Sequence, residues 1–223
     1  MRRCRFAFTI VCAAALAFTA PASAAAVPAA EHDPVIFVHG WNGSSWNWDA
    51  MKADFENNGY SSDELHAWDY DTAQSNEITA EEFAGYVDEV LASAGASQVD
   101  VVTHSMGGLN TRWYLSFLDG TSKVDDWVSL GGPNHGTTSA EGCGDDSCAD
   151  MRPGSEFLTQ LNEGDETPGD TSYATWWSPC DGVVYPAEST VLDGAENTEL
   201  ACVSHLGLLA NHEVMEGVRA FVA

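Results

Sequence analysis

Short, mainly apolar runs alternate along the chain with longer segments whose apolar residues recur at helical spacing. The runs at 35–38, 99–102 and 124–130 predict buried β-strands, and weaker strand candidates lie at 65–70, 173–177 and 199–203. The helical pattern covers 46–57, 79–94, 105–118 and 211–222, and Thr79 and Glu82 are spaced as a capping box at the start of the second of these helices. This alternation predicts an α/β fold in which helices cover both faces of a parallel sheet.

The segment 131–168 interrupts this alternation. It is rich in Gly, Asp, Ser and Thr, and its apolar patch at Phe157 and Leu158 is short. A loop of this length in a compact domain is usually functional or poorly ordered. Because it follows the strand predicted at 124–130, it should lie over the carboxyl edge of the sheet, where α/β proteins bind ligands. We expect it to shield the functional site.

The first 24 residues have the features of a secretory signal peptide. Arg2, Arg3 and Arg5 precede an almost wholly apolar stretch at 6–18, and Ala22-Ser23-Ala24 supplies the small residues of a cleavage site. The apolar stretch is shorter than the roughly 20 residues of a membrane-spanning helix, and no later segment qualifies. We therefore expect cleavage after Ala24, a secreted, extracellular protein without a transmembrane segment, and a single α/β domain over residues 25–223.

Acidic residues dominate the composition. The chain has 34 Asp and Glu against eight Lys and Arg, for a formal net charge of −26, and three of the eight basic residues lie in the predicted leader. Such a surface repels phosphate groups, so a nucleic acid partner is not expected. Asp145, Asp146 and Asp150 could supply calcium ligands, but their spacing does not match an EF-hand loop. A solvated acidic surface is the interpretation that we favour.

Four of the six cysteines follow the predicted leader, which contains Cys4 and Cys12. An even number of cysteines in an exported protein predicts two disulfides. A zinc site would need closely spaced cysteine pairs, and only Cys143 and Cys148 approach that spacing. Four cysteines permit three pairings; the short separation favours Cys143–Cys148, which leaves Cys180 for Cys202.

Ser105 lies between a predicted strand and a predicted helix, the context of a nucleophile elbow. The sequence Thr103-His104-Ser105-Met106-Gly107 differs from the usual G-x-S-x-G pattern at its first position, where a β-branched threonine suits the end of a strand. A glycine two residues after the serine leaves room for a sharp turn. The alternative is an ordinary strand–helix connection in which the serine caps the helix.

A nucleophilic serine needs an acid and a base, which follow it in that order in this architecture. Asp181 follows the strand predicted at 173–177 and is favoured over Asp193, which lies in a turn-like sequence. His205 follows the last predicted strand and is favoured over His212, which lies near the start of the terminal helix.

Two peptide N–H groups are predicted to form an oxyanion hole. One belongs to Trp41, in the glycine-bearing loop after the first strand, and the other to Met106, directly after the serine. The remaining histidines of these loops, His39, His104 and His135, are predicted to have structural roles.

Four motifs together resemble the small secreted bacterial lipases of the Bacillus and actinomycete type. They are HGWNG at 39–43, THSMGG at 103–108, LGGPNHGT at 130–137 and SHLG at 204–207. The resemblance covers the chain from about residue 32 to its end. It implies a compact α/β-hydrolase with a six-stranded, mainly parallel sheet flanked by helices. The segment 136–169 departs from the nearly lidless Bacillus enzymes.

The resemblance also implies roles for the candidate site residues. Ser105 would be the nucleophile, Asp181 the acid and His205 the base, with Trp41 and Met106 as oxyanion donors. The expected function is that of a secreted serine carboxylester hydrolase, a triacylglycerol lipase or esterase, which forms an acyl-enzyme on Ser105. We expect a lipid ester substrate, met at a lipid–water interface, and a monomer that needs no cofactor and no metal ion.

Other functions would use the same residues. An acyltransferase, a thioesterase or a polyester hydrolase shares the nucleophile, acid, base and oxyanion donors named above. A hydrolase scaffold can also serve as a non-catalytic module that binds lipids or surfaces, since a fold does not determine a function. The order of serine, acid and histidine along the chain favours an enzyme over a binding module.

Overall fold

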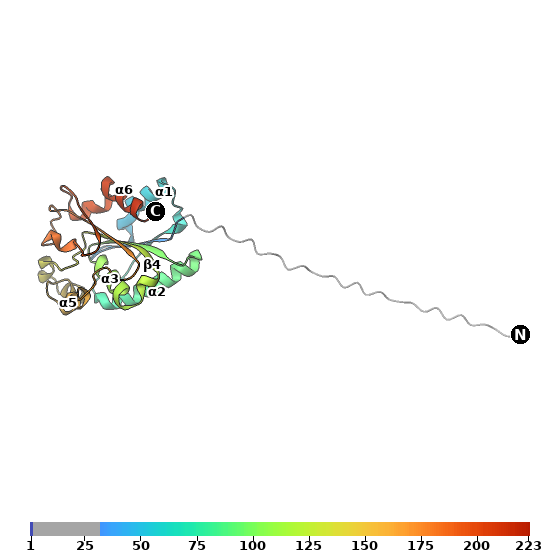
Figure 1. The fold of residues 1–223 in the computed structure, drawn as a ribbon, viewed down its shortest axis with the longest axis horizontal. Helices are drawn as coiled ribbons and strands as arrows, with labels where there is room; N and C mark the ends of the chain where they lie inside the picture. The colour runs from blue at the N-terminus through green and yellow to red at the C-terminus, as the bar shows by residue number, and fades with distance from the viewer. Residues whose placement is uncertain (2–31) are drawn as a thin grey trace.

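The structure is a computed structural model, and it describes Met1 and residues 32–223. The predicted signal peptide, with Cys4 and Cys12, lies outside the described residues apart from Met1. The described part forms one α/β unit built on a single sheet, with layers of helices on its two faces (Figure 1). No helix in this part of the chain combines the length and apolar character that a membrane crossing requires.

The sheet has six strands, all parallel, in the order β2-β1-β3-β4-β5-β6. The strands are β1 (Val35–Val38), β2 (Leu65–Trp68), β3 (Val99–His104), β4 (Val124–Leu130), β5 (Ser172–Trp177) and β6 (Glu196–Glu199). Strands β1 and β3 are buried along their whole length. A strand covered on both faces favours a mainly apolar sequence, which is why the sequence pattern located the central strands well. The prediction of a six-stranded α/β sheet is confirmed.

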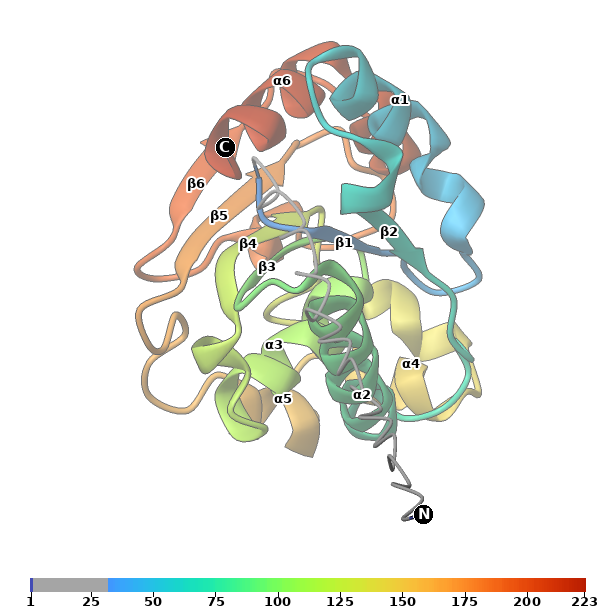
Figure 2. The ribbon, with the colours of Figure 1, turned by 90° about the vertical axis from the view of Figure 1, so that its right-hand side faces the viewer.

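Helices pack on both faces of the sheet (Figure 2). The α1 (Asp49–Asn57) and α6 (His212–Phe221) helices pack on one face, and α2 (Asn76–Ala94) and α3 (Gly107–Phe117) on the other. Alternate residues of β1 divide between the two cores, since Val35 and Phe37 contact the first layer while Ile36 and Val38 contact the second. This alternation follows from the pleat of a strand.

Short helices connect the main elements. The α4 (Asp146–Asp150) and α5 (Glu156–Leu161) helices lie in the segment after β4. The 3₁₀ turns are η1 (Ser45–Trp48), η2 (Ser62–Glu64), η3 (Gly120–Ser122), η4 (Thr138–Gly142), η5 (Ala187–Thr190) and η6 (His205–Ala210). The segment 131–168 is therefore more regular than its composition predicts. It buries Met151, Phe157, Leu158 and Leu161 in the same core as α2 and α3.

The start of α2 differs from the prediction. The helix begins at Asn76, and the Ser75 hydroxyl caps it by accepting the N–H of Ile78 at 3.4 Å. Thr79 lies inside the first turn, where its hydroxyl donates to the Ser75 carbonyl. The capping box predicted at Thr79 and Glu82 is therefore wrong, because a serine four residues earlier already supplies the cap.

The last strand also differs from the prediction. Strand β6 runs from Glu196 to Glu199 rather than over 199–203, and its residues are mostly exposed. It is an edge strand whose polar side chains carry no apolar pattern, so periodicity could not locate it. Leu200 and Val203, which suggested a strand, instead pack as part of a loop against the core that contains α1 and α6.

Aspartates gather at the amino ends of the central strands, opposite to the end that carries Ser105. Carboxylate oxygens of Asp33, Asp100 and Asp125 lie within 4.8 Å of one another. The Asp100 side chain is buried and accepts the N–H of Asp126 at 3.3 Å. Burial, together with the neighbouring carboxylates of Asp126, Asp33 and Asp125, raises the pKa of Asp100 to about 9. This group therefore holds a proton in the folded protein at neutral pH.

Replacing Asp100 by asparagine is expected to stabilise the protein at pH 8 but not at pH 4. Because the folded-state pKa is raised, the stability linked to protonated Asp100 is fully present below the unfolded pKa of about 3.9 and is lost as the pH rises towards about 9. Asparagine is uncharged throughout and can still accept the Asp126 N–H. We expect Tm to rise by roughly 4 °C or more at pH 8, since about 2–4 °C corresponds to 1 kcal/mol in a domain of this size.

Thermal melts at both pH values, in buffer with EDTA, measure this difference. Glu89→Gln, which removes one charge from the exposed face of α2, is the matched control and should change Tm little at either pH. A decrease in the Tm of Asp100→Asn at pH 8 would show that the ionised carboxylate stabilises the fold.

Candidate active site

Ser105 occupies a sharp turn between β3, which ends at His104, and α3, which begins at Gly107. Its φ of 54° lies in the left-handed region, which residues other than glycine rarely adopt. The Ser105 N–H donates to the carbonyl of Leu130 at 2.9 Å, and its carbonyl accepts the N–H of Gly108 at 3.0 Å. A strained residue held by its surroundings is typical of functional sites. The left-handed turn also explains why α3 begins two residues later than predicted.

Asp181 and His205 meet at the same edge of the sheet. Nδ1 of His205 lies 2.8 Å from Oδ2 of Asp181, and both side chains are buried. The other carboxylate oxygen accepts the N–H groups of Val184 at 2.7 Å and Val183 at 2.9 Å. A carboxylate only accepts hydrogen bonds, so Nδ1 carries the proton and Nε2 is left free to act as a base.

The charge on Asp181 is stabilised by its hydrogen bonds. Burial by itself raises the pKa of Asp181, but the hydrogen bond from His205 and those from the peptide N–H groups of Val184 and Val183 outweigh it. The net pKa lies below its ordinary value. Asp181 is therefore ionised at neutral pH and can stabilise a positively charged His205.

The alternative acid and base lie in different surroundings. The N–H of Asp193 donates to Oε2 of Glu166, and the Asp193 side chain is exposed. His212 is exposed at the start of α6, where it lies 3.8 Å from Glu216. The structure thus pairs Asp181 with His205, the combination that the sequence analysis favoured.

Two glycines place these groups beside one another. A Cβ atom added to Gly40 would lie 2.6 Å from Cβ and 3.1 Å from Oγ of Ser105, so the loop after β1 directly adjoins the serine. A Cβ atom added to Gly131 would lie 3.1 Å from Oδ2 of Asp181 and 3.2 Å from Nδ1 of His205. Gly131 also has a φ of 58°. The ends of β1, β3 and β4 therefore converge on one site.

The loops that carry Asp181 and His205 are tied together by main-chain contacts and a disulfide. The N–H of His205 donates to the carbonyl of Asp181 at 2.8 Å. The buried hydroxyl of Ser178 accepts the N–H of Cys180 at 3.1 Å and that of Val203 at 2.9 Å. Cys180 is bonded to Cys202, and Cys143 to Cys148, which are the pairings that the sequence analysis favoured.

His104 contacts both the main chain and the ring of His205. Its Nε2 lies 3.0 Å from the carbonyl oxygen of His205, and the two rings are 4.5 Å apart between centroids. Burial, reinforced by the adjacent His205, lowers the pKa of His104 to about 3. The neutral ring therefore donates a hydrogen bond from Nε2 to the carbonyl, which is the structural role predicted for it.

The loop that carries Trp41 is supported by buried aromatic residues. Nδ1 of His39 lies 2.9 Å from the Gly40 carbonyl, and its ring stacks on Tyr70 with centroids 4.4 Å apart. The Tyr70 hydroxyl donates to the His39 carbonyl at 2.6 Å. Burial lowers the pKa of His39, and this effect outweighs the hydrogen bond to Gly40 and the nearby Asp69 carboxylate, which raise it. His39 thus holds the loop in place, as predicted, while His135 lies 2.7 Å from Glu166 in a different part of the molecule.

The two predicted oxyanion donors flank Ser105. Trp41 follows Gly40, which adjoins the serine, and Met106 follows the serine itself. Within residues 32–223, neither the N–H of Trp41 nor that of Met106 donates to a loop or side-chain acceptor. Both groups are therefore available to a substrate oxygen.

The sequence of residues 32–205 matches the family model described as lipase (class 2). The chain belongs to this lipase family. It is 29% identical over 139 residues to a triacylglycerol lipase of Burkholderia plantarii, an alignment that covers 58% of this chain and 38% of that protein. It is 27% identical over 119 residues to a triacylglycerol lipase of Pseudarthrobacter phenanthrenivorans, covering 51% of this chain and 37% of the relative. The chain thus spans less than two fifths of the length of these curated relatives.

The fold is shared with solved lipase structures. The mature form of the Bacillus licheniformis lipase BlEst2 superposes with a TM-score of 0.76 at 20% identity, covering 88% of this chain and 94% of that one. The resemblance to small bacterial lipases of the α/β-hydrolase type, which the sequence analysis drew from four motifs, is confirmed.

A cavity of about 760 Å³ opens onto Ser105 and His205. Its lining includes Trp41, Trp46, Met151, Val183, Val184 and Leu206, and is therefore mainly apolar. The exposed side chains of Trp46 and Leu206 stand at its edge. A cavity of this size and character can accept an acyl chain beside the serine hydroxyl.

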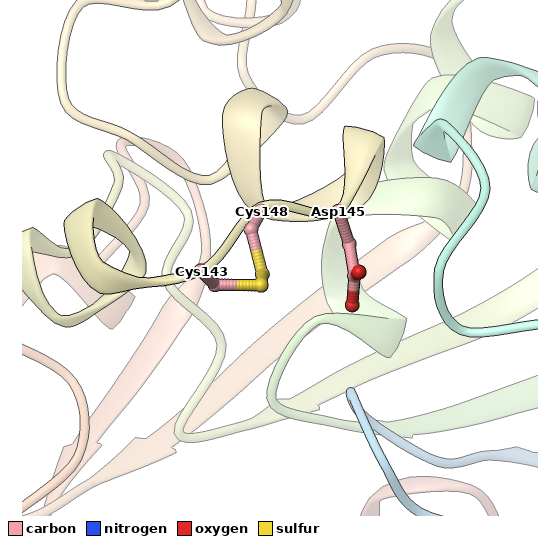
Figure 3. Close-up of side chains that lie close together, drawn as sticks. All are labelled: Cys143, Asp145 and Cys148. Atoms are coloured by element: carbon pink, nitrogen blue, oxygen red, sulfur yellow. A yellow bond between two sulfur atoms is a disulfide. The ribbon is translucent and has the colours of Figure 1, made fainter.

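The segment 137–151 forms one wall of this cavity. The sequence predicted that this part of the chain shields the site but not that it forms a cavity wall. Cys143, Asp145, Cys148 and Met151 all contribute to the wall. The sulfur atoms of Cys143 and Cys148 lie beside the Asp145 carboxylate (Figure 3) but are joined in a disulfide, so they are not thiolate ligands for zinc. The calcium interpretation of this segment finds no support in the described contacts, because Asp145 accepts a hydrogen bond from Trp41 and Asp150 from Asn76.

Proposed function

We propose that the protein is a secreted serine carboxylester hydrolase, a triacylglycerol lipase or esterase that cleaves lipid esters through an acyl-enzyme on Ser105. The observation that carries this proposal is the buried Asp181–His205 hydrogen bond at the sheet edge where Ser105 sits in a left-handed turn. Membership of the class 2 lipase family and the mainly apolar cavity beside the serine support the same reaction class.

The reaction begins with transfer of the Ser105 hydroxyl proton to Nε2 of His205. The serine oxygen attacks the ester carbonyl carbon, and Asp181 stabilises the imidazolium that forms. The peptide N–H groups of Trp41 and Met106 donate to the oxygen that becomes negatively charged. His205 then passes the proton to the departing alcohol, which leaves the acyl group on Ser105.

Hydrolysis of the acyl-enzyme repeats these steps with water. His205 takes a proton from the water molecule, and the resulting attack on the acyl carbon forms a second tetrahedral intermediate in the same oxyanion site. Collapse of this intermediate releases the fatty acid and returns the proton to Ser105. His205 carries the proton in both halves of the reaction.

The proposal includes export of the enzyme. Residues 1–24 would act as the signal peptide, and residues 25–223 would form the mature enzyme. Two disulfides in a chain of this size support an oxidising compartment. The apolar side chains at the cavity edge support a substrate at a lipid–water interface.

A fluorophosphonate probe tests the proposal directly. The probe is expected to label the protein once, and peptide mass spectrometry should locate the label on Ser105. The same preparation should hydrolyse emulsified triacylglycerols and short-chain esters. A folded protein that is neither labelled nor able to hydrolyse any ester would instead be a binding module, and a preference for thioesters or for acyl transfer to alcohols would change the assigned reaction.

A further inference from the structure

Trp41 is held by a contact that the mechanism above does not use. Its indole Nε1 donates to Oδ2 of Asp145 at 2.9 Å, although the two residues are 104 positions apart in the sequence. Asp145 belongs to the cavity wall, and Trp41 carries one of the two proposed oxyanion donors on its peptide nitrogen. The hydrogen bond therefore joins the wall to the oxyanion loop.

The Asp145 carboxylate is presented from a well-anchored turn. The Cys143–Cys148 disulfide closes the turn around it, and Figure 3 shows the carboxylate projecting from the turn beside the two sulfur atoms. The Arg152 guanidinium donates to the Cys143 carbonyl at 2.7 Å. The hydroxyl of Ser147 donates to the carbonyl of Thr72 at 2.6 Å.

Further contacts fix the same wall to α2. Oδ2 of Asp150 accepts the peptide N–H of Asn76 at 2.8 Å and its side-chain amide at 3.2 Å. The wall is thus fastened on both sides of Asp145. An acceptor held in this way can restrain the group that donates to it.

Contacts restrain the oxyanion loop on both sides of the Gly40–Trp41 peptide, and Asp145 supplies one on the Trp41 side. Gly40 precedes Trp41 and has no side chain to limit rotation of the peptide between them, and Asn42 follows with a φ of 55°. The Gly40 carbonyl, which belongs to the same peptide as the Trp41 N–H, accepts the Gly43 N–H at 3.0 Å and lies 2.9 Å from Nδ1 of His39. On the Trp41 side of this peptide, the described contacts are the indole hydrogen bond to Asp145 and a 3.3 Å contact from the Asn42 N–H to Thr72. Fixing the indole of Trp41 therefore helps to fix the direction of its peptide N–H.

We propose that Asp145 is a positioning residue for the oxyanion hole: by accepting the indole N–H of Trp41, it aims the Trp41 peptide N–H at the substrate oxygen. This inference rests on the proposed function, since it assigns a role within that reaction. An oxyanion contact strengthens as charge develops in the transition state, so its loss lowers kcat more than it raises KM.

The test compares four variants on a soluble short-chain ester. Asp145→Ala is expected to lower kcat by roughly 5- to 20-fold with KM changed less than twofold, which is less than the roughly 100-fold or greater cost of removing an oxyanion donor outright. Asp145→Asn should stay within about threefold of the parent, because the amide oxygen accepts the same indole N–H. Trp41→Phe removes the donor and should match Asp145→Ala, and the double variant Trp41→Phe/Asp145→Ala should be no slower than Trp41→Phe alone.

Asp146→Ala is the matched control. Asp146 is exposed on the same turn and should keep the kcat of the parent. Unchanged kcat in Asp145→Ala, a loss confined to KM, or multiplicative losses in the double variant would each overturn the inference. Circular dichroism and Tm establish that each variant is folded. If Asp145→Ala does not fold, Trp41→Phe, which removes the same hydrogen bond, and Asp145→Asn, which keeps it, still make the comparison.

A second readout does not depend on turnover. The indole N–H resonance of Trp41, identified by its absence from Trp41→Phe, should shift and exchange faster in Asp145→Ala than in the parent or in Asp145→Asn. An unshifted resonance would overturn the inference. Failure of the proposed function would look different, since the parent protein itself would then lack ester hydrolysis and probe labelling.

Discussion

Ser105→Ala is expected to abolish fluorophosphonate labelling and to lower ester turnover on the order of 10⁴-fold or more, while the fold survives. The magnitude follows from the cooperation of the three groups, because Asp181 and His205 have nothing to activate once the hydroxyl is gone. The substitution leaves the Asp181–His205 hydrogen bond and the oxyanion loop in place. Binding of a substrate analogue should therefore change far less than kcat.

A matched serine from the same cavity serves as the control. Ser139 lines the cavity, and its hydroxyl donates to the carbonyl of Val183 at 2.6 Å rather than to Asp181 or His205. Ser139→Ala should stay labelled and keep turnover within a few-fold of the parent. Near-parental turnover in Ser105→Ala, measured on protein purified away from host esterases, would show that another residue is the nucleophile.

Local sequence features predicted most of the fold because the central strands are buried on both faces. β1 is an unbroken apolar run and β4 has apolar residues at four of its seven positions, and both were located to the residue. The errors fall where a competing local feature decides the structure. Ser75 caps α2 ahead of Thr79, and the exposed residues of β6 pair with β5 without any apolar signal.

The candidate catalytic residues could be predicted from their order along the chain and their positions after strands. Ser105, Asp181 and His205 each follow a strand, and parallel strands bring their carboxyl ends to one edge of the sheet. The contact between Trp41 and Asp145 could not be predicted in this way, because it depends on how a long connecting segment folds back over the sheet. The aspartate cluster at the amino ends was equally hidden, since Asp33, Asp100 and Asp125 become neighbours only through the register of β1, β3 and β4.

Removal of the Cys180–Cys202 disulfide is expected to lower stability strongly and activity only weakly. The bridge closes a loop with a sequence separation of 22, for which the loss of unfolded-state entropy gives about 3 kcal/mol of stabilisation. At about 2–4 °C per kcal/mol, Cys180→Ser/Cys202→Ser should lower Tm by roughly 6–12 °C. Peptide mapping without reduction should first establish the pairing in the parent protein.

The weak effect on activity follows from the contacts that remain. Without the bridge, the N–H of His205 still donates to the carbonyl of Asp181, and Ser178 still accepts the N–H of Val203. These contacts hold the acid against the base, so kcat measured well below the new Tm should stay within about threefold of the parent. A kcat that falls tenfold or more at such a temperature would show that the bridge itself positions Asp181 and His205.

Removal of the Cys143–Cys148 disulfide is expected to affect activity more than stability. The Cys143–Cys148 bridge has a sequence separation of only 5, so Cys143→Ser/Cys148→Ser should lower Tm less than the other pair does. Its turn, however, presents Asp145 to Trp41, and a looser turn weakens the restraint on the oxyanion loop. We therefore expect this variant to lose more kcat and less stability than Cys180→Ser/Cys202→Ser. The test compares thermal melts and kcat values at 20 °C for both double variants. If the variant with the larger loss of Tm also has the larger loss of kcat, the expectation is wrong.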